Sequence, residues 1–259
     1  MKDVVQLDTR HGPMFALRGD QYVTRSLALY GEFSGLEWAL LEQLASSGSA
    51  VVEVGANIGA HTIPLARRCA PGPLIAFEPQ QRVYQLLCAN VALNGLDNVF
   101  AHAEALGEAE GHAVLPRVDY GADLNFGGVA VGADGEAGVR VRMTTLDSLA
   151  LPACDLLKID VEGHEAAVLR GAARTIARHR PVLYLENDRD DRKGEVIATV
   201  HGLGYRMYWH APPLFNPRNP RGVQDNVFGT VGSLNMLCLP AEQDVDMGGM
   251  AAVDPHAWT

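Results

Sequence analysis

Short, continuous apolar runs alternate with helical stretches through the middle of the chain, and this alternation restricts the fold more than any other feature. The runs cover residues 51–54, 74–77, 99–103, 156–159 and 182–185, and the helical stretches cover 63–69, 83–93 and 165–179. Strands that are apolar on both faces are typical of parallel sheets covered by helices on both sides. With two later runs, at 205–210 and 234–239, the pattern predicts a doubly wound α/β domain with a mostly parallel seven-stranded sheet.

The turn after the first run carries the clearest ligand-binding signal. Glu53 is followed by Gly55, Ala56, Asn57 and Gly59, and glycines in a strand-to-helix turn let the backbone approach a ligand closely. A carboxylate at this place repels the pyrophosphate of a dinucleotide but favours a ligand with positive charge. S-adenosylmethionine meets that requirement, because its ammonium and sulfonium groups are cationic.

Glu78 adds a second residue to this interpretation. It ends the next apolar run and precedes Pro79, where a carboxylate can accept hydrogen bonds from both hydroxyls of a ribose. Glu53 and Glu78 together therefore predict one nucleoside site. A dehydrogenase is an alternative, but Glu53 and the spacing Gly-x-x-x-Gly, in place of Gly-x-Gly-x-x-Gly, oppose it.

Composition excludes several other classes of protein. The chain has 259 residues and is 47% hydrophobic, which suits one α/β domain with extensions. Its formal net charge of −10 disfavours a nucleic-acid partner, and its four cysteines form no Cys-x-x-Cys pair that would indicate zinc. Because it has no apolar signal core or membrane-length run, we expect a cytoplasmic protein without a membrane partner. The oligomeric state stays open, with a homodimer as one alternative.

Three regions are expected along the chain. Residues 1–50 form an accessory segment with strands near 14–17 and 22–24 and a helix near 36–44, which a capping box from Ser34 to Glu37 would begin. Residues 51–242 form the main domain, with a small hairpin within 107–143 and a lid loop at 211–232 that carries Arg218 and Arg221. Residues 243–259 are expected to be a mobile tail.

Several motifs resemble one family of enzymes. They are Tyr30-Gly31-Glu32, Glu53 to Gly59, Phe77-Glu78-Pro79, Asn94, Glu104 to Gly107, Thr145 to Leu149 and Lys158 to Glu165. Over roughly residues 27–190 the chain resembles the FkbM-type family of class I S-adenosylmethionine-dependent methyltransferases. This resemblance implies a Rossmann-like fold and methyl transfer, usually to oxygen. Glu53 stands where the family usually has Asp, and the segment 211–232 belongs to a subset of the family at most.

Candidate site residues follow the ends of the strands, because ligands bind at the carboxyl edge of an open α/β sheet. Expected cofactor contacts are Glu32 at the methionine end, Glu53, Gly55, Ala56, Asn57, Gly59, Glu78, Pro79, Glu104 and Ala105 beside the adenine, and Asp160. The expected catalytic residues are Asp160, Glu162, His164 and Glu186. A carboxylate there could orient an acceptor or remove its proton, and an imidazole could act as a base.

Asp160, Glu186 and Asn187 also form a set of oxygen ligands that would suit Mg²⁺. Direct contacts with cofactor and acceptor explain these residues without a cation, so we predict no metal. The predicted function is methyl transfer from S-adenosylmethionine to a hydroxyl of a small-molecule acceptor, a sugar or a polyketide-like natural product. An N-methyltransferase acting on an amine and a catalytically inactive nucleoside-binding domain remain as alternatives.

Overall fold

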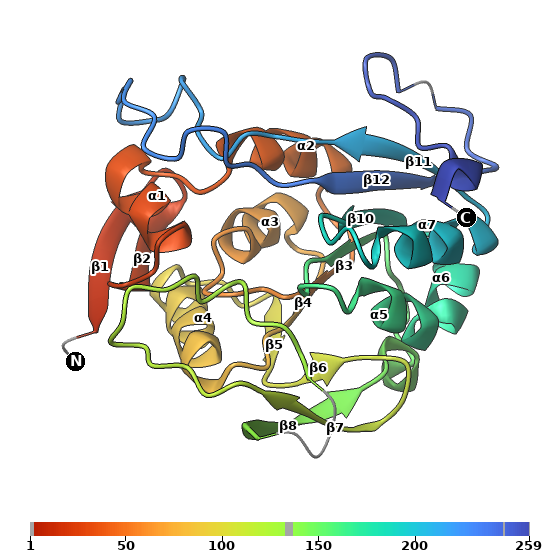
Figure 1. Ribbon diagram of the computed structural model, residues 1–259, viewed down its shortest axis with the longest axis horizontal. Helices are drawn as coiled ribbons and strands as arrows, with labels where there is room; N and C mark the ends of the chain where they lie inside the picture. Colours follow the sequence, from red (N-terminus) through yellow and green to blue (C-terminus); the bar gives the residue numbers. More distant parts are fainter. Residues whose placement is uncertain (1–2, 133–136, 246, 259) are drawn as a thin grey trace.

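A seven-stranded sheet with the order β11-β12-β10-β9-β3-β4-β5 forms the centre of the computed structural model, which describes residues 3–132, 137–245 and 247–258 (Figure 1). The strands are β3 (Val51–Val54), β4 (Leu74–Phe77), β5 (Val99–His102), β9 (Leu156–Ile159), β10 (Val182–Glu186), β11 (Tyr205–His210) and β12 (Asn235–Pro240). All neighbours pair in parallel except β12, which is antiparallel to both β10 and β11. The doubly wound, mostly parallel sheet expected from the sequence is confirmed.

Helices cover both faces of this sheet. On one face lie α2 (Gly35–Leu44), α3 (Thr62–Cys69) and α4 (Gln81–Leu93), and on the other α5 (Glu165–Gly171), α6 (Ala173–His179) and α7 (Lys193–Gly202). Because successive strand residues point to opposite faces, Val51 packs in the core under α2 to α4 and Val52 in the core under α5 to α7. No helix in the described part of the chain is long and apolar enough to span a bilayer.

The helix expected over 165–179 is divided into α5 and α6. The carboxylate of Asp147, in the 3₁₀ turn η1 (Leu146–Leu149), accepts hydrogen bonds from the backbone N–H groups of Arg174 and Thr175 at 2.9 and 2.7 Å. Gly171 also lies so close to Gly107 that a Cβ there would be 1.9 Å from the Gly107 carbonyl oxygen. Asp147 therefore caps the start of α6 from a distant part of the sequence. No pattern within residues 165–179 predicts that start.

The accessory segment differs from the expectation in two places. It holds an antiparallel hairpin of β1 (Val4–Thr9) and β2 (Gly12–Leu17), followed by α1 (Val23–Tyr30) where a strand was expected at 22–24. Asp20 accepts hydrogen bonds from the backbone of Tyr22 and Thr24, both at 3.0 Å, and so stabilises the helix start. The expected capping box is wrong, since the Ser34 hydroxyl donates to Glu37 Oε2 at 2.9 Å instead of capping the backbone.

The stretch 107–143 contains the expected hairpin. β6 (Ala105–Leu106), β7 (Gly111–Leu115) and β8 (Val139–Thr144) form a small sheet in the order β6-β8-β7, with β7 and β8 antiparallel. Residues 133–136 of this stretch lie outside the described residues.

Part of the expected tail is docked on the sheet. The backbone N–H of Trp209 in β11 donates to the Ala251 carbonyl at 2.8 Å, and that of Val253 donates to the Met207 carbonyl at 2.9 Å. Val253 is buried in the core beside α7, and the turn η2 (Pro255–Trp258) contacts that helix (Figure 1). Residues 251–253 therefore do not form a mobile tail, while residues 246 and 259 lie outside the described residues.

Val253→Ala should lower the free energy of unfolding by about 1–2 kcal/mol, because two buried methyl groups are lost from a core position that is 6% exposed. Val245→Ala is the matched control, since that valine is 42% exposed, and it should change the free energy by less than about 0.5 kcal/mol. Chemical denaturation of both variants measures the difference. Equal effects would contradict the docking of the C-terminal segment.

Candidate functional site

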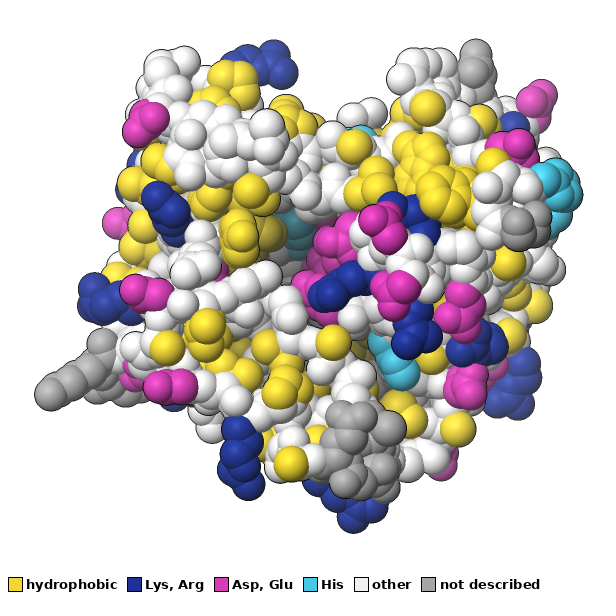
Figure 2. Space-filling model, viewed as in Figure 1, with side chains coloured by type: hydrophobic (Ala, Val, Ile, Leu, Met, Phe, Trp, Pro, Cys, Tyr) yellow, Lys and Arg dark blue, Asp and Glu magenta, His cyan; other side chains and the backbone are white. Residues whose placement is uncertain are grey.

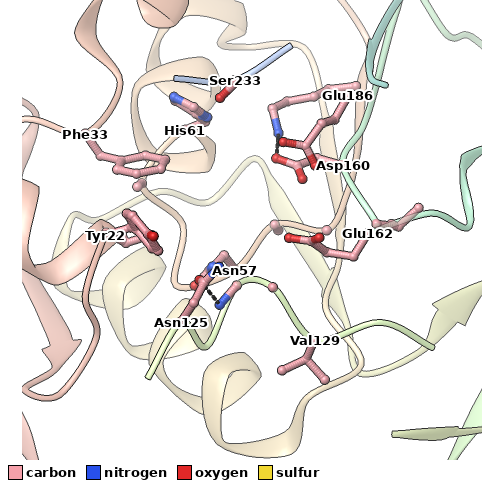
Figure 3. A pocket seen from close by; sticks show the side chains of 18 of the residues that line it. Tyr22, Phe33, Asn57, His61, Asn125, Val129, Asp160, Glu162, Glu186 and Ser233 are labelled. Carbon is pink, nitrogen blue, oxygen red and sulfur yellow. Dashed lines mark hydrogen bonds and ion pairs between the residues drawn. The ribbon is translucent and has the colours of Figure 1, made fainter. Parts of the chain in front are cut away.

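A cavity of about 400 Å³ opens at the carboxyl ends of β3, β4, β9 and β10. Figure 2 shows Asp and Glu side chains gathered beside a hollow in the centre of this face, and Figure 3 shows residues from several elements around the cavity. Its walls come from the strand ends, from the accessory segment, from residues 125–131 and from the end of the segment 211–232.

The turn after β3 can take its shape only with glycine at two places. Gly55 has a φ of 84°, and a Cβ on it would lie 1.8 Å from the carbonyl oxygen of Asp160. Gly59 has a φ of 92°, and its Cβ would lie 2.9 Å from a methyl group of Leu87. Gly55, Ala56 and Asn57 line the cavity, whereas Gly59 acts from behind by letting the turn join α3.

Glu78 fixes this turn to the end of β4. Its carboxylate accepts hydrogen bonds from the backbone N–H of Asn57 at 3.0 Å and of Gln80 at 2.8 Å. Burial raises the pKa of Glu78 to about 7. Glu78 and Pro79 both line the cavity, and their expected contact with the cofactor stays a prediction.

A buried lysine lies behind the turn. Glu53 and Lys158 are register partners on β3 and β9, so their side chains lie side by side on one face of the sheet. Lys158 Nζ is 3.9 Å from Glu53 Oε1 and 3.2 Å from Asp160 Oδ2, and Glu53 also accepts a hydrogen bond from the Thr62 hydroxyl at 2.6 Å. Burial raises the pKa of Glu53 to about 7. Lys158 was not among the predicted site residues, although a lysine inside a continuous apolar run was a signal for it.

An acidic wall stands on the side of β9 and β10. The carboxyl groups of Asp160 and Glu186 lie next to each other (Figure 3). Glu162 pairs with Arg189. Burial, and then the neighbouring charge of Asp160, raises the pKa of Glu186 well above its usual range. Burial raises the pKa of Asp160 as well, but the charge of Lys158 and the other neighbouring groups that lower this pKa together outweigh burial, and the net shift is downward. Asp160, Glu162 and Glu186 all line the cavity, and their expected catalytic role stays a prediction.

The opposite wall comes from the accessory segment and was missed by the sequence analysis. Tyr22, Phe33 and Glu37 line the cavity there, together with His61 at the start of α3 (Figure 3). Glu37 is 4% exposed, and its Oε1 lies 4.0 Å from His61 Nδ1. In the sequence Glu37 matches the last position of a capping box, a pattern that gives no indication of a place in the site.

Glu104 and Ala105 do not line the cavity, which corrects their expected position beside an adenine. Glu104 pairs with Arg142 at 3.1 Å, and Ala105 is buried in β6, where pairing with β8 directs it into the small sheet. The corresponding wall is made by Asn125, Gly127, Gly128, Val129 and Val131. Gln80 holds this wall through a 2.9 Å hydrogen bond to the Phe126 carbonyl.

Two further predicted residues point elsewhere. Glu32 is buried between Arg10, at 2.7 Å, and the side-chain amide of Asn216, at 2.8 Å, so it ties the accessory segment to the segment 211–232 and does not line the cavity. His164 precedes α5, and its Nε2 packs near Gly107 on the side of the small sheet. Burial lowers the pKa of His164, and it is not positioned to act as a base in the cavity.

Asn187 does not complete an oxygen set with Asp160 and Glu186. Its side-chain amide donates to the Lys193 carbonyl at 3.4 Å and to the Met236 sulfur at 3.5 Å, which turns it away from the cavity. Among residues 3–132, 137–245 and 247–258, no three His, Cys, Asp or Glu side chains are grouped to hold a metal ion. The expectation that no divalent cation is needed stays a prediction.

The segment 211–232 forms a roof that is docked on α1. Arg221 donates to the Asp8 carbonyl at 2.9 Å and to the Ala28 carbonyl, and the Tyr30 hydroxyl donates to the Asp225 carbonyl at 2.8 Å. Arg221 is therefore an anchor and does not line the cavity. The residues at the cavity from this region are Leu214, Val231, Gly232 and Ser233.

Known proteins are similar in sequence to parts of this chain. The family model described as "Methyltransferase FkbM domain" matches residues 53–207. Methyltransferase sdnD from Sordaria araneosa is 30% identical over an alignment of 160 positions, and the match covers 47% of this chain and 59% of that protein. A tRNA(Phe) (4-demethylwyosine(37)-C(7)) aminocarboxypropyltransferase from Methanocaldococcus jannaschii is 39% identical over 56 residues, 22% of each chain. The matches thus span less than two thirds of both curated relatives.

Similar solved structures include a methyltransferase FkbM from Methylobacillus flagellatus KT, with 17% identity and a TM-score of 0.47 over 74% of this chain and 44% of that chain. The structure of M. jannaschii TYW2 in complex with AdoMet has 13% identity and a TM-score of 0.46 over 92% of this chain and 86% of that one.

Gly55→Ala should destabilise the protein far more than Gly48→Ala. Both glycines have positive φ, so alanine costs about 1–2 kcal/mol of backbone strain at either place. Only at Gly55 does the new methyl group also meet a backbone oxygen, whereas nothing lies within 4 Å at Gly48. Thermal unfolding of the two variants is the measurement, and similar melting temperatures would show that the turn does not lie against Asp160.

Proposed function

Since this chain belongs to the FkbM methyltransferase family, whose domain matches residues 53–207, we propose that it transfers a methyl group from S-adenosylmethionine to a hydroxyl of a small molecule. The observation that carries this proposal is the buried Glu78 carboxylate, which lies at the cavity beside the turn of Gly55 and Asn57. Each of its oxygens has a further lone pair that can accept a ribose hydroxyl.

The charge of the cavity supports a cationic cofactor. Glu37, Glu53, Glu78, Asp160, Glu162, Glu186 and Asp188 line it, and the only Lys or Arg side chains among its lining residues are Lys158 and Arg189. Such a site favours the ammonium and sulfonium of S-adenosylmethionine and repels the pyrophosphate of NAD. When bound, S-adenosylmethionine supplies an electrophilic methyl group. The protein then has to orient the acceptor and remove its proton.

Two unlike walls suit an acceptor with apolar surface and a hydroxyl group. Tyr22 and Phe33 lie on one side, and the carboxylates of Asp160 and Glu186 lie on the other (Figure 3). Leu214 from the roof packs in the same apolar cluster as Tyr22 and Phe33. We propose a sugar or polyketide-like acceptor held between the two walls, with its hydroxyl toward the carboxylates.

The function is tested by incubating the protein with methyl-labelled S-adenosylmethionine and a panel of glycosides and polyhydroxylated polyketides. We expect labelled methyl ethers from at least one acceptor. Methylation of nitrogen in amino-bearing members would favour an N-methyltransferase instead. Tight cofactor binding with no methylated product from any acceptor would favour an inactive nucleoside-binding domain.

Glu78→Ala should weaken binding of S-adenosylmethionine by roughly 10- to 150-fold, because loss of a charge-assisted hydrogen bond costs about 1.5–3 kcal/mol. Glu104→Ala is the control, since Glu104 pairs with an exposed arginine outside the cavity, and it should leave the affinity within about twofold. Titration calorimetry with S-adenosylmethionine, S-adenosylhomocysteine and NAD decides the matter. Tight binding of NAD, or equal affinities in the two variants, would contradict the assigned cofactor site.

Changing Leu214 and Val231 together to Ala should reduce turnover of the best acceptor tenfold or more, equivalent to about 1.4 kcal/mol, while the cofactor dissociation constant stays within about twofold. The reason is that both side chains line the cavity from the roof, whereas the turn and Glu78 lie below it. Gln224→Ala, in an exposed part of the same segment, is the control. Loss of cofactor affinity with unchanged acceptor selectivity would contradict the assignment of the roof to the acceptor and of the turn and Glu78 to the cofactor.

A further inference from the structure

Lys158 is a buried cation placed between two parts of the site. It is 2% exposed, and its ammonium contacts Glu53 below the turn and Asp160 at the cavity. Asp160 is different, because its side chain is 38% exposed and can meet a ligand. Lys158 itself cannot serve as a base, because burial lowers its pKa but the surrounding carboxylates raise it further, so it keeps its proton.

Asp160 and Glu186 hold adjacent carboxyl groups at the cavity (Figure 3). Two carboxylates side by side repel each other, so one of the pair favours its protonated form and the two groups share one proton. The two partners are not equivalent, since the Lys158 ammonium is 3.2 Å from Asp160 Oδ2 and its other ion pair is with Glu53. The cation therefore favours a negative charge on Asp160 over one on Glu186.

We propose that Lys158 is a positioning residue that keeps Asp160 ionised and leaves the shared proton on Glu186, so that Asp160 is the carboxylate that receives the proton of the acceptor hydroxyl. The assignment of the proton rests on the 3.2 Å contact between Lys158 and Asp160 and does not require the proposed function. The catalytic consequence rests on the proposed function.

The step balances with these groups. The acceptor O–H bond breaks and its proton moves to Asp160, while the oxygen forms a bond to the methyl carbon. The carbon–sulfur bond breaks, and its electron pair stays on sulfur, which turns the sulfonium of the cofactor into the thioether of S-adenosylhomocysteine. One negative charge on Asp160 and one positive charge on sulfur are thereby neutralised together.

Other charged groups face Asp160 from each neighbouring element. They are Glu53 from β3, Glu37 from α2, His61 from α3, Glu186 and Asp188 from β10 and the residues after it, and Glu162 with its partner Arg189. Burial raises the pKa of Glu37 and of Glu53, which the charge of Lys158 opposes, and lowers that of His61 to about 3, so His61 adds no cation beside Asp160 at neutral pH. Arg189 is engaged by Glu162, which leaves Lys158 as the cation that acts on Asp160.

The test is an infrared titration of the full chain labelled with ¹³C in its aspartate or glutamate carboxyl groups, with S-adenosylhomocysteine bound. Asp160→Asn and Glu186→Gln assign the bands. We expect an ionised Asp160 and a protonated Glu186 at neutral pH. In Lys158→Met the titration midpoint of Asp160 should rise by about 1–3 pH units, because a cation within 4 Å is lost. Lys158→Arg keeps the charge and should restore the midpoint to within about half a unit.

An unshifted Asp160 midpoint in folded Lys158→Met would overturn the proposal, as would a neutral acid band that disappears in Asp160→Asn and persists in Glu186→Gln. If Lys158→Met does not fold, the band assignment from the other two variants still decides which carboxyl holds the proton. The double variant Lys158→Met with Glu53→Gln also removes the buried carboxylate that Lys158 pairs with. It allows the shift of the Asp160 midpoint to be measured in a second variant that lacks the Lys158 charge.

Activity gives an independent readout. Asp160→Asn should lose more than 100-fold in turnover, and Glu186→Gln less than tenfold, because glutamine is uncharged and close in shape to a protonated glutamic acid. The reverse order would make Glu186 the proton acceptor and overturn the proposal. A protein that binds no S-adenosylhomocysteine would contradict the proposed function but not the proton assignment, because the titration can be run without a ligand.

Discussion

The ammonium of Lys158 lies between Glu53 and Asp160 because the parallel register of β3 and β9 places Glu53 and Lys158 side by side. Buried charges are strongly unfavourable unless they are paired, so this arrangement constrains both strand ends at once. The turn at Gly55 lies against the Asp160 carbonyl, and the Glu78 carboxylate accepts a hydrogen bond from the backbone N–H of Asn57 in the same turn. The floor of the cavity is therefore continuous with the central sheet. A change in the register of β3 and β9 would separate Glu53 from Lys158 and remove these contacts.

The roof of the cavity depends on contacts between segments far apart in sequence. Glu32 joins Arg10 of the accessory segment to Asn216, and Tyr30 joins α1 to the backbone at Asp225 and Val227. These side chains are absent from the cavity lining, yet they place Phe33 and Leu214 over it. An acceptor would therefore meet a wall that is already assembled, which lowers the ordering cost of binding.

The local spacing of apolar residues was sufficient to predict the strands of the sheet, but it was insufficient to predict several helix ends. The strands of the sheet are short, apolar runs whose signal is complete within a few residues. The starts of α1 and α6 depend on the carboxylates of Asp20 and Asp147, and Asp147 acts from a turn more than twenty residues away. Ser34 and Glu37 match a capping box in sequence, but the Ser34 hydroxyl donates a hydrogen bond to the Glu37 carboxylate, which lines the cavity.

By itself the sequence determined that Glu53, Glu78, Asp160 and Glu186 would meet at one edge, because parallel strands end on the same side of a sheet. It also determined the glycine turn, since positive φ restricts the residue that can be used. Only the tertiary structure decided that Glu37, His61 and the stretch 125–131 complete the cavity, and that Glu32, Glu104, His164 and Asn187 point away from it. The direction of a side chain after a strand end depends on partners that are distant in sequence. The spacing of apolar residues along the chain does not identify those partners.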